Sequence, residues 1–170
     1  TGVQTCALPI SGPNTGGMGA YTPVPQIPEE AVQQAISQVL KPTAKGMVAE
    51  KRPFQGILYA GLIQTATGPK VIEFNARFGD PETQVVLARL ESPLSEIISS
   101  LLAKEQPTIV WNELASVGVV VAAEGYPNQY KTNLPLPEMS GETIYYAGVT
   151  RSEQALVSAG GRIFLAEATA

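Results

Sequence analysis

Two stretches rich in β-forming residues, separated by a short turn, constrain the fold of this chain most. Residues 56–64 read GILYAGLIQ and residues 70–75 read KVIEFN, and residues 65–69 between them are typical of a hairpin turn. We therefore predict a β-hairpin whose first strand is buried. Because side chains alternate along a strand, Ile72 and Phe74 are expected to point into a core.

Helices are predicted on both sides of this hairpin. Residues 29–40 carry apolar side chains at helical spacing, and residues 42–50 are expected to continue that helix after a break, because Pro42 has no N–H to donate. Asp80 and Ser92 each precede a proline, an arrangement typical of a helix start with a capping side chain. The second of these helices is expected over residues 94–103.

The last third of the chain predicts a small, mostly β module. Residues 104–111, which precede it, are typical of a linker. Near the start of the chain, residues 11–28 are typical of a loop. Short strand candidates follow the linker, separated by turn residues. They cover residues 116–123, 143–149 and 162–166. The predicted fold class is α+β.

Composition narrows the possible functions. The 170 residues are 44% hydrophobic and 15% charged, which suits a packed core. The net charge is -4 and no basic run occurs, so a nucleic-acid partner is not expected. The sequence has no histidine, which removes the commonest general base. No signal peptide is visible and no stretch approaches the roughly 18 apolar residues of a membrane helix, so we expect a cytoplasmic protein with no membrane partner.

One strand face predicts a metal site. Glu73 and Asn75 share a face of the second hairpin strand, and Arg77 joins them if the extended backbone continues. Carboxylate and amide oxygens suit Mg²⁺, and arginine offers a planar fork to phosphate oxygens. These three residues thus fit a site for a metal ion and a nucleotide's phosphates. A solvated strand face with an Arg–Glu pair fits the same spacing.

A glycine-rich segment is a second candidate site. Asn14, Thr15, Gly16, Gly17, Met18 and Gly19 form the sequence NTGGMG. Three glycines let a backbone approach a ligand closely and expose N–H groups to an anion. The pattern is neither a dinucleotide fingerprint nor a Walker A loop, and an ordinary turn explains it equally well.

The first ten residues are interpreted as an artefact. Residues 1–10 read TGVQTCALPI, which is identical to the in-frame translation of a common sequencing-library adapter. A natural loop is the alternative. If the adapter reading holds, Cys6 is not native, the native part has no cysteine, and an amino-terminal region is missing.

Longer motifs resemble the phosphoribosylamine–glycine ligases, which are ATP-grasp enzymes of purine synthesis. The matching segments are GPNTGGMGAYTPVP at 12–25, PTAKGM at 42–47, GILYAGL at 56–62, EFNARFGDPETQVV at 73–86, SVGVVVAAEGYP at 116–127 and AGGRIFLAEA at 159–168. The hexapeptide RFGDPE at 77–82 is the most specific of them. The resemblance implies that residues 11–106 are the distal part of an ATP-grasp domain and that residues 107–170 are a truncated carboxy-terminal domain.

The resemblance also implies a reaction and roles for the candidate residues. ATP, glycine and 5-phosphoribosylamine would give glycinamide ribonucleotide, ADP and phosphate through a glycyl phosphate. Glu73 and Asn75 would bind Mg²⁺ or Mn²⁺, Arg77 would contact the transferred phosphate, and residues 14–19 would line the active site. The full-length enzyme is expected to be a monomer, and this chain alone is expected to be inactive.

Two other readings stay open at this point. Another ATP-grasp carboxylate–amine ligase would use a different acceptor, which substrate-dependent ADP release would reveal. A non-catalytic binding module would keep the fold and lose Mg–ATP binding.

Overall fold

The computed structural model describes residues 4–5, 13–141, 143–153 and 155–170, whose contacts form two compact units. Unit 1 contains residues 24–79 and 90–111, and unit 2 contains residues 13–23, 80–89 and 112–170 together with residues 4–5. Helices and sheets both occur, so the predicted α+β class is confirmed. Each unit is described by itself below.

Unit 1 begins with one long helical run rather than two helices. It consists of α1 (Glu29–Ala35), a π-helical turn (Ile36–Leu40) and α2 (Lys41–Ala49), without interruption. The predicted break at Pro42 is therefore wrong. The N–H of Lys41 bonds to the carbonyl of Ile36, so the helix widens just before the proline. A wider turn there lets the helix continue past a residue that cannot donate a hydrogen bond.

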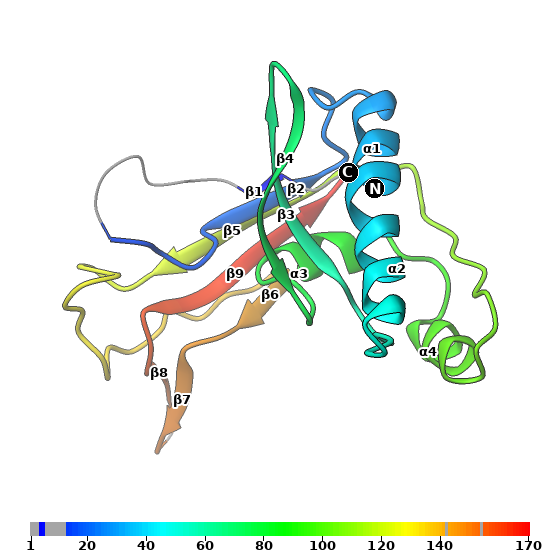
Figure 1. The fold of residues 1–170 in the computed structure, drawn as a ribbon. Helices are drawn as coiled ribbons and strands as arrows, with labels where there is room; N and C mark the ends of the chain where they lie inside the picture. Colours follow the sequence, from blue (N-terminus) through cyan, green and yellow to red (C-terminus); the bar gives the residue numbers. More distant parts are fainter. Residues whose placement is uncertain (1–3, 6–12, 142, 154) are drawn as a thin grey trace. The chain divides into compact units, whose positions relative to one another are not determined.

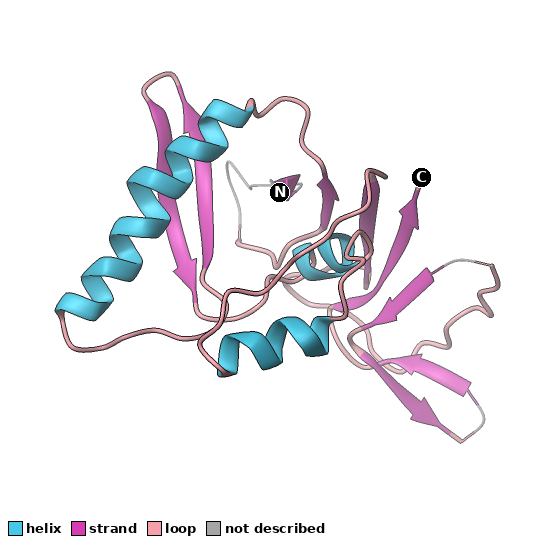
Figure 2. Ribbon diagram, turned by 90° about the vertical axis from the view of Figure 1, so that its right-hand side faces the viewer, coloured by secondary structure: helices cyan, strands magenta, loops and turns pink. Residues whose placement is uncertain are grey.

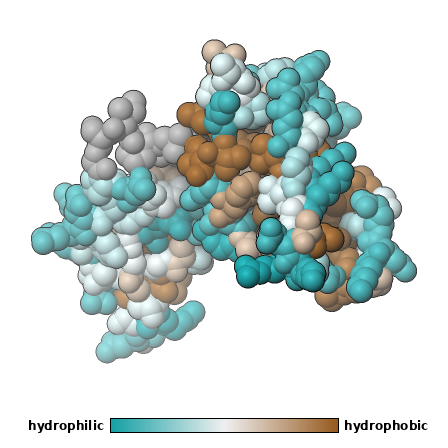
Figure 3. Space-filling view, viewed as in Figure 1, coloured by the Kyte–Doolittle hydropathy of each residue, from teal (hydrophilic) through white to brown (hydrophobic). Residues whose placement is uncertain are grey.

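The predicted hairpin is confirmed as β3 (Tyr59–Thr65) and β4 (Gly68–Asn75), which pair antiparallel beside the helical run (Figures 1 and 2). The expectation that the first strand is buried is wrong, because β3 has no buried residue. The expectation that Ile72 and Phe74 face a core is also wrong, since they are 54% and 42% exposed. Among the described residues this sheet has two strands, so both are edge strands. Figure 3 shows apolar residues at the surface around this hairpin.

A second helix in unit 1, α4 (Leu94–Leu102), lies where the sequence predicted it, and Ile97 is its buried residue. Its start is not capped by a side chain. Ser92 instead accepts a hydrogen bond from the backbone N–H of Val110 at 2.8 Å. The predicted capping role of Ser92 is thus wrong, because its hydroxyl ties the helix to the segment that leaves it.

Unit 2 is built on an antiparallel sheet with the strand order β1-β2-β5-β9-β6. The strands are β1 (Gln4–Thr5), β2 (Gly19–Thr22), β5 (Ser116–Ala122), β6 (Thr143–Tyr146) and β9 (Arg162–Thr169). Residues 19–22 were expected to be loop, so that part of the prediction is wrong. A four-residue strand is too short to show a period in the sequence, and only its pairing with β5 defines it.

The core of unit 2 lies between this sheet and α3 (Glu82–Leu87). Burial alternates along β5, with Ser116, Gly118 and Val120 inside. A side chain at Gly118 would come within 2.9 Å of both Leu165 and Val85, so the glycine lets the helix pack closely on the sheet.

Asp80 does not cap α3. Pro81 occupies the N-cap position, and no side chain makes a capping hydrogen bond there. The helix thus starts near the predicted place but without the predicted cap.

The last strands of unit 2 differ from the prediction for residues 143–149. The chain turns after β6, and β7 (Val149–Ser152) pairs with β8 (Ala155–Ser158) as a separate hairpin. Gly148 is the turning point, since a side chain there would lie 2.6 Å from the carbonyl of Arg162. Strand β8 was not predicted, and β9 extends three residues further than expected.

The two units are not consecutive along the chain. Residues 13–23 and α3 group with the later strands because β2 pairs with β5 and α3 packs on both. The compact units are defined by contacts and not by family boundaries. The assignment of residues 11–106 and 107–170 to two domains of a family therefore stays a prediction. The adapter origin of residues 1–10 stays a prediction as well. None of the helices in the described part of the chain is long and apolar enough to cross a membrane.

Candidate functional site

Glu73 and Asn75 lie on the same side of β4. The Nδ2 atom of Asn75 donates a hydrogen bond to Oε1 of Glu73 at 3.0 Å. The alternation of side chains along the strand brings them together, as the sequence predicted. Glu73 is exposed and Asn75 is half-buried, so both polar groups remain accessible. The strand therefore presents an acidic oxygen and an amide within reach of one small ligand.

The neighbouring strand leaves room for the Glu73 side chain. Gly61 of β3 is its direct partner across the hairpin. A Cβ atom at Gly61 would lie 3.2 Å from Cγ of Glu73, which is tighter than an ordinary contact. The register shifts just after Gly61, between it and Leu62. The hairpin thus positions Glu73 opposite the one residue type that cannot crowd it.

Arg77 does not extend this face. Strand β4 ends at Asn75, and the chain bends at residues 76 and 77. The Nη1 atom of Arg77 donates to the carbonyl of Phe78 at 2.8 Å. The condition on which Arg77 was grouped with Glu73, a continued extended backbone, is therefore not met.

The Glu73–Asn75 pair fits Mg²⁺ or Mn²⁺ by its chemistry. Both residues offer hard oxygen atoms, and Mg²⁺ usually takes one or two protein ligands together with water and phosphate oxygens. Within residues that the structure describes, no three carboxylates, cysteines or histidines gather as a complete metal cage. A site completed by a nucleotide's phosphates suits this arrangement better than a structural metal site does.

The glycine-rich segment is a loop that ends in a strand. Residues 14–18 are loop and Gly19 is the first residue of β2. The N–H of Gly16 donates to the hydroxyl of Tyr126 at 2.8 Å, and the carbonyl of Met18 accepts from the N–H of Val120 at 3.0 Å. Other residues of unit 2 therefore hold the loop in place, and it is not an isolated flexible turn.

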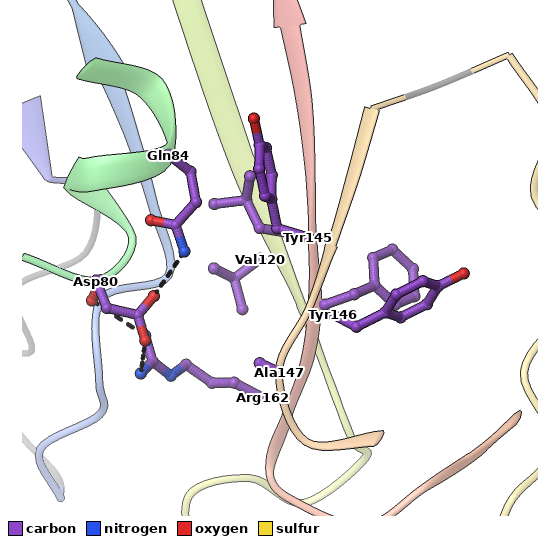
Figure 4. Close-up of a pocket in the computed structure, with 9 residues that line it drawn as sticks. Asp80, Gln84, Val120, Tyr145, Tyr146, Ala147 and Arg162 are labelled. Carbon is purple, nitrogen blue, oxygen red and sulfur yellow. Dashed lines mark hydrogen bonds and ion pairs between the residues drawn. The ribbon is translucent and has the colours of Figure 1, made fainter. Parts of the chain in front are cut away.

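An arginine that the sequence analysis did not single out lies next to this loop. Arg162, the first residue of β9, donates from Nη1 to the carbonyls of Gly17 and Asp80, both at 3.1 Å. Its Nη2 atom pairs with Oδ2 of Asp80 at 2.8 Å (Figure 4). The other carboxylate oxygen of Asp80 accepts from Gln84 at 3.2 Å. In the sequence, only the pair Gly160 and Gly161 just before Arg162 indicates that two parts of the chain approach closely here.

A cavity of about 210 Å³ opens beside this ion pair. Figure 4 shows Gln84 and Asp80 on one side of it, Val120 and Tyr145 on the other, and Arg162 reaching across to Asp80. Gln84 holds Oε1 in a buried position without a hydrogen-bond partner. The lining residues are Asp80, Gln84, Val120, Tyr145, Tyr146, Ala147, Arg162, Phe164 and Leu165.

The candidate residues thus fall into two groups. Glu73, Asn75 and Arg77 belong to unit 1, whereas residues 14–19 belong to unit 2. Glu82 is buried at 8% exposure in the first turn of α3, which fits a structural role for this carboxylate.

In a comparison with known proteins, the two halves of the chain match two domains of the same enzyme family. Residues 10–83 match the family model of the phosphoribosylglycinamide synthetase ATP-grasp (A) domain, and residues 116–170 match that of the phosphoribosylglycinamide synthetase C domain. The chain belongs to the phosphoribosylglycinamide synthetase family. The cluster around Arg162 therefore draws on both family models, since Gly17 and Asp80 lie in the first match and Arg162 in the second.

Individual members of the phosphoribosylglycinamide synthetase family are also similar. The phosphoribosylamine–glycine ligase of Lactococcus lactis is 56% identical over 161 residues, covering 93% of this chain and 39% of the relative. That of Halalkalibacterium halodurans is 54% identical over 158 residues, covering 91% and 37%. The crystal structure of the Thermotoga maritima ligase superposes with a TM-score of 0.84 at 31% identity, covering 94% of this chain and 40% of that one. This chain spans about two fifths of the length of these relatives.

Proposed function

We propose that this chain is part of an ATP-dependent ligase that joins glycine to 5-phosphoribosylamine, giving glycinamide ribonucleotide, ADP and phosphate in de novo purine biosynthesis. Family membership supports the reaction, and one observation in the structure carries the chemistry. The observation is the pair of Glu73 and Asn75, whose polar groups meet at 3.0 Å on an accessible strand face.

Within this proposal Glu73 and Asn75 hold Mg²⁺ or Mn²⁺ beside the ATP phosphates. The bound ion would neutralise phosphate charge. Glu73 supplies a full negative charge and Asn75 a neutral oxygen, so the pair leaves a net positive charge on the ion for the phosphates to balance. Because Gly61 has no side chain, the Glu73 carboxylate can turn toward a ligand without meeting a side chain at that position of the opposite strand.

The reaction itself needs positioning more than a side-chain nucleophile. The γ-phosphoryl group of ATP moves to a carboxylate oxygen of glycine, and ADP leaves. The amine of 5-phosphoribosylamine then attacks the acyl carbon, phosphate leaves, and the nitrogen loses a proton. Such steps depend on charge neutralisation and alignment, which suits a chain that has no histidine.

Arg77 in unit 1 and the glycine-rich loop in unit 2 each have features that suit a phosphate-containing ligand. Arg77 is exposed and bonded only to a neighbouring carbonyl in the described residues, so its guanidinium can leave that carbonyl for a phosphate oxygen. Residues 14–18 form a loop already held in place by Tyr126, Val120 and Arg162. A fixed loop with small residues lets a ligand approach the backbone closely.

The test uses an extended protein, in which the Lactococcus lactis relative supplies the sequence that lies outside the match to this chain. It is expected to form glycinamide ribonucleotide only when ATP, glycine, 5-phosphoribosylamine and a divalent ion are all present. Glu73→Ala should reduce product formation to background, because the ion loses its charged ligand. Glu96→Ala, which changes an exposed carboxylate on α4, should leave the rate unchanged. Product formation by Glu73→Ala at the rate of the unmodified extended protein would refute the metal assignment.

A further inference from the structure

The side chain of Arg162 joins two segments that are far apart in the sequence. Three of its hydrogen bonds reach Gly17 and Asp80, and two of them end on backbone carbonyls. A hydrogen bond to a backbone carbonyl positions the main chain, whichever side chain that residue carries. The guanidinium, with its planar set of donors, can reach both segments at once.

The glycine-rich loop is shaped to receive this arginine. A Cβ atom on Gly16 would lie 2.8 Å from both Cζ and Nε of Arg162, closer than real side chains approach. Any other residue at position 16 would displace the guanidinium or the loop. The sequence therefore pairs a residue without a side chain with a long, charged one, and the two lie in contact.

A tyrosine in the turn that follows β5 holds the same loop. The hydroxyl of Tyr126 accepts the N–H of Gly16 at 2.8 Å. The ring of Tyr126 lies so close to Gly161 that a Cβ there would be 2.2 Å from Cδ2. Gly161 thus admits the tyrosine, and the next residue along the chain is Arg162 itself.

From these contacts we infer that Arg162 and Tyr126 are positioning residues for the ligase reaction. They hold the glycine-rich loop at Gly16 and Gly17 against the turn at Asp80, so that the loop keeps its shape when substrates bind. We call these five residues the arginine clamp. The inference rests on the proposed function, in which the loop lines the active site.

Stability alone does not explain the clamp. The side chain of Asp80 is 47% exposed and that of Arg162 is 23% exposed. Ion pairs this open to water contribute little to the free energy of folding. Removing Arg162 should therefore disturb the position of the loop more than it lowers the stability of unit 2.

The first experiment uses the 170-residue chain and needs no catalysis. Amide hydrogen exchange at Gly16 is measured in Tyr126→Phe, Arg162→Met and Arg162→Lys, with Arg151→Met as the matched control on the exposed β7 hairpin. Tyr126→Phe removes the hydrogen bond of the Gly16 N–H itself, and Arg162→Met removes the bonds that hold the adjacent Gly17 against Asp80. Each change should speed exchange at Gly16 about two- to tenfold. Far-UV circular dichroism confirms that each variant is folded. Exchange at Gly16 equal to that of Arg151→Met in both variants would overturn the clamp.

The second experiment measures steady-state kinetics in the extended protein. Arg162→Met should lower kcat by about tenfold or more, since small misplacements of a site are costly, while its thermal midpoint stays near that of Arg151→Met. Arg162→Lys should recover part of the loss because it keeps a charged donor. An unchanged kcat in Arg162→Met would overturn the positioning role. If the unmodified extended protein forms no product, the proposed function fails, and exchange at Gly16 still decides whether the clamp exists.

Discussion

Glycines at three positions leave space that neighbouring side chains or a helix occupy. Gly61 leaves space for Glu73, Gly16 admits Arg162, and Gly118 lets α3 pack on the sheet. Each depends on a contact between residues distant in sequence, so composition alone could not separate these glycines from those of ordinary turns. Glu73 and Asn75 were predictable because they lie two residues apart on one strand. Arg162 was not, because its partners lie 82 and 145 residues away.

The packing at Gly118 gives a prediction at this scale. Gly118→Ala should destabilise the chain by about 1–3 kcal/mol, because the new methyl group would meet Leu165 and Val85 at 2.9 Å. Gly46→Ala is the matched control. Its Cβ would meet nothing within 4 Å, and replacing glycine inside a helix should stabilise by about 1 kcal/mol. Urea unfolding followed by circular dichroism measures both, and equal midpoints for the two variants would contradict the packing described.

Elements with a strong local pattern were predictable, and elements defined by distant pairing were not. The β3–β4 hairpin and α4 were expected close to their observed bounds, because each carries its own signal. The short strand β2 and hairpin strand β8 have no such signal and are defined only by their partners β5 and β7. The helical run passes Pro42 because a π-helical turn accommodates it, which no local propensity would indicate.

The register of the β3–β4 hairpin leads to a second prediction. Gly61→Val in the extended protein should raise the concentration of Mg²⁺ needed for half-maximal rate by about tenfold, since it crowds the Glu73 side chain without removing it. Ala60→Val is the control, because Ala60 pairs with Phe74 and its side chain points to the other face. Magnesium titration of the initial rate measures the difference. Equal requirements in the two variants would argue against a metal at Glu73.

At the scale of the whole molecule, the sequence indicated the class and the family but not the grouping of segments. The motif RFGDPE at 77–82 and the strand candidates near the end were enough to indicate the relationship that the family models support. The compact units divide RFGDPE itself, with residues up to 79 in unit 1 and those from 80 in unit 2. That division follows from strand pairing across the chain, which the order of motifs does not reveal.

The length of the chain relative to its relatives gives the third prediction. Since it spans 39% of the Lactococcus lactis ligase, the 170-residue chain should form no glycinamide ribonucleotide by itself. The extended protein should form it under the same conditions. A chromatographic assay of the product measures both, and turnover by the 170-residue chain alone would contradict this prediction.

Binding of Mn²⁺ and ATP to the extended protein tests the role of Glu73 most directly. Equilibrium dialysis measures the affinity in the unmodified protein, in Glu73→Gln and in the matched variant Glu96→Gln. Glu73→Gln should bind at least about tenfold more weakly, the loss typical even of residues that only support metal ligands, and Glu96→Gln should bind as the unmodified protein does. Equal affinity in all three proteins would contradict the assignment of Glu73 as a metal ligand.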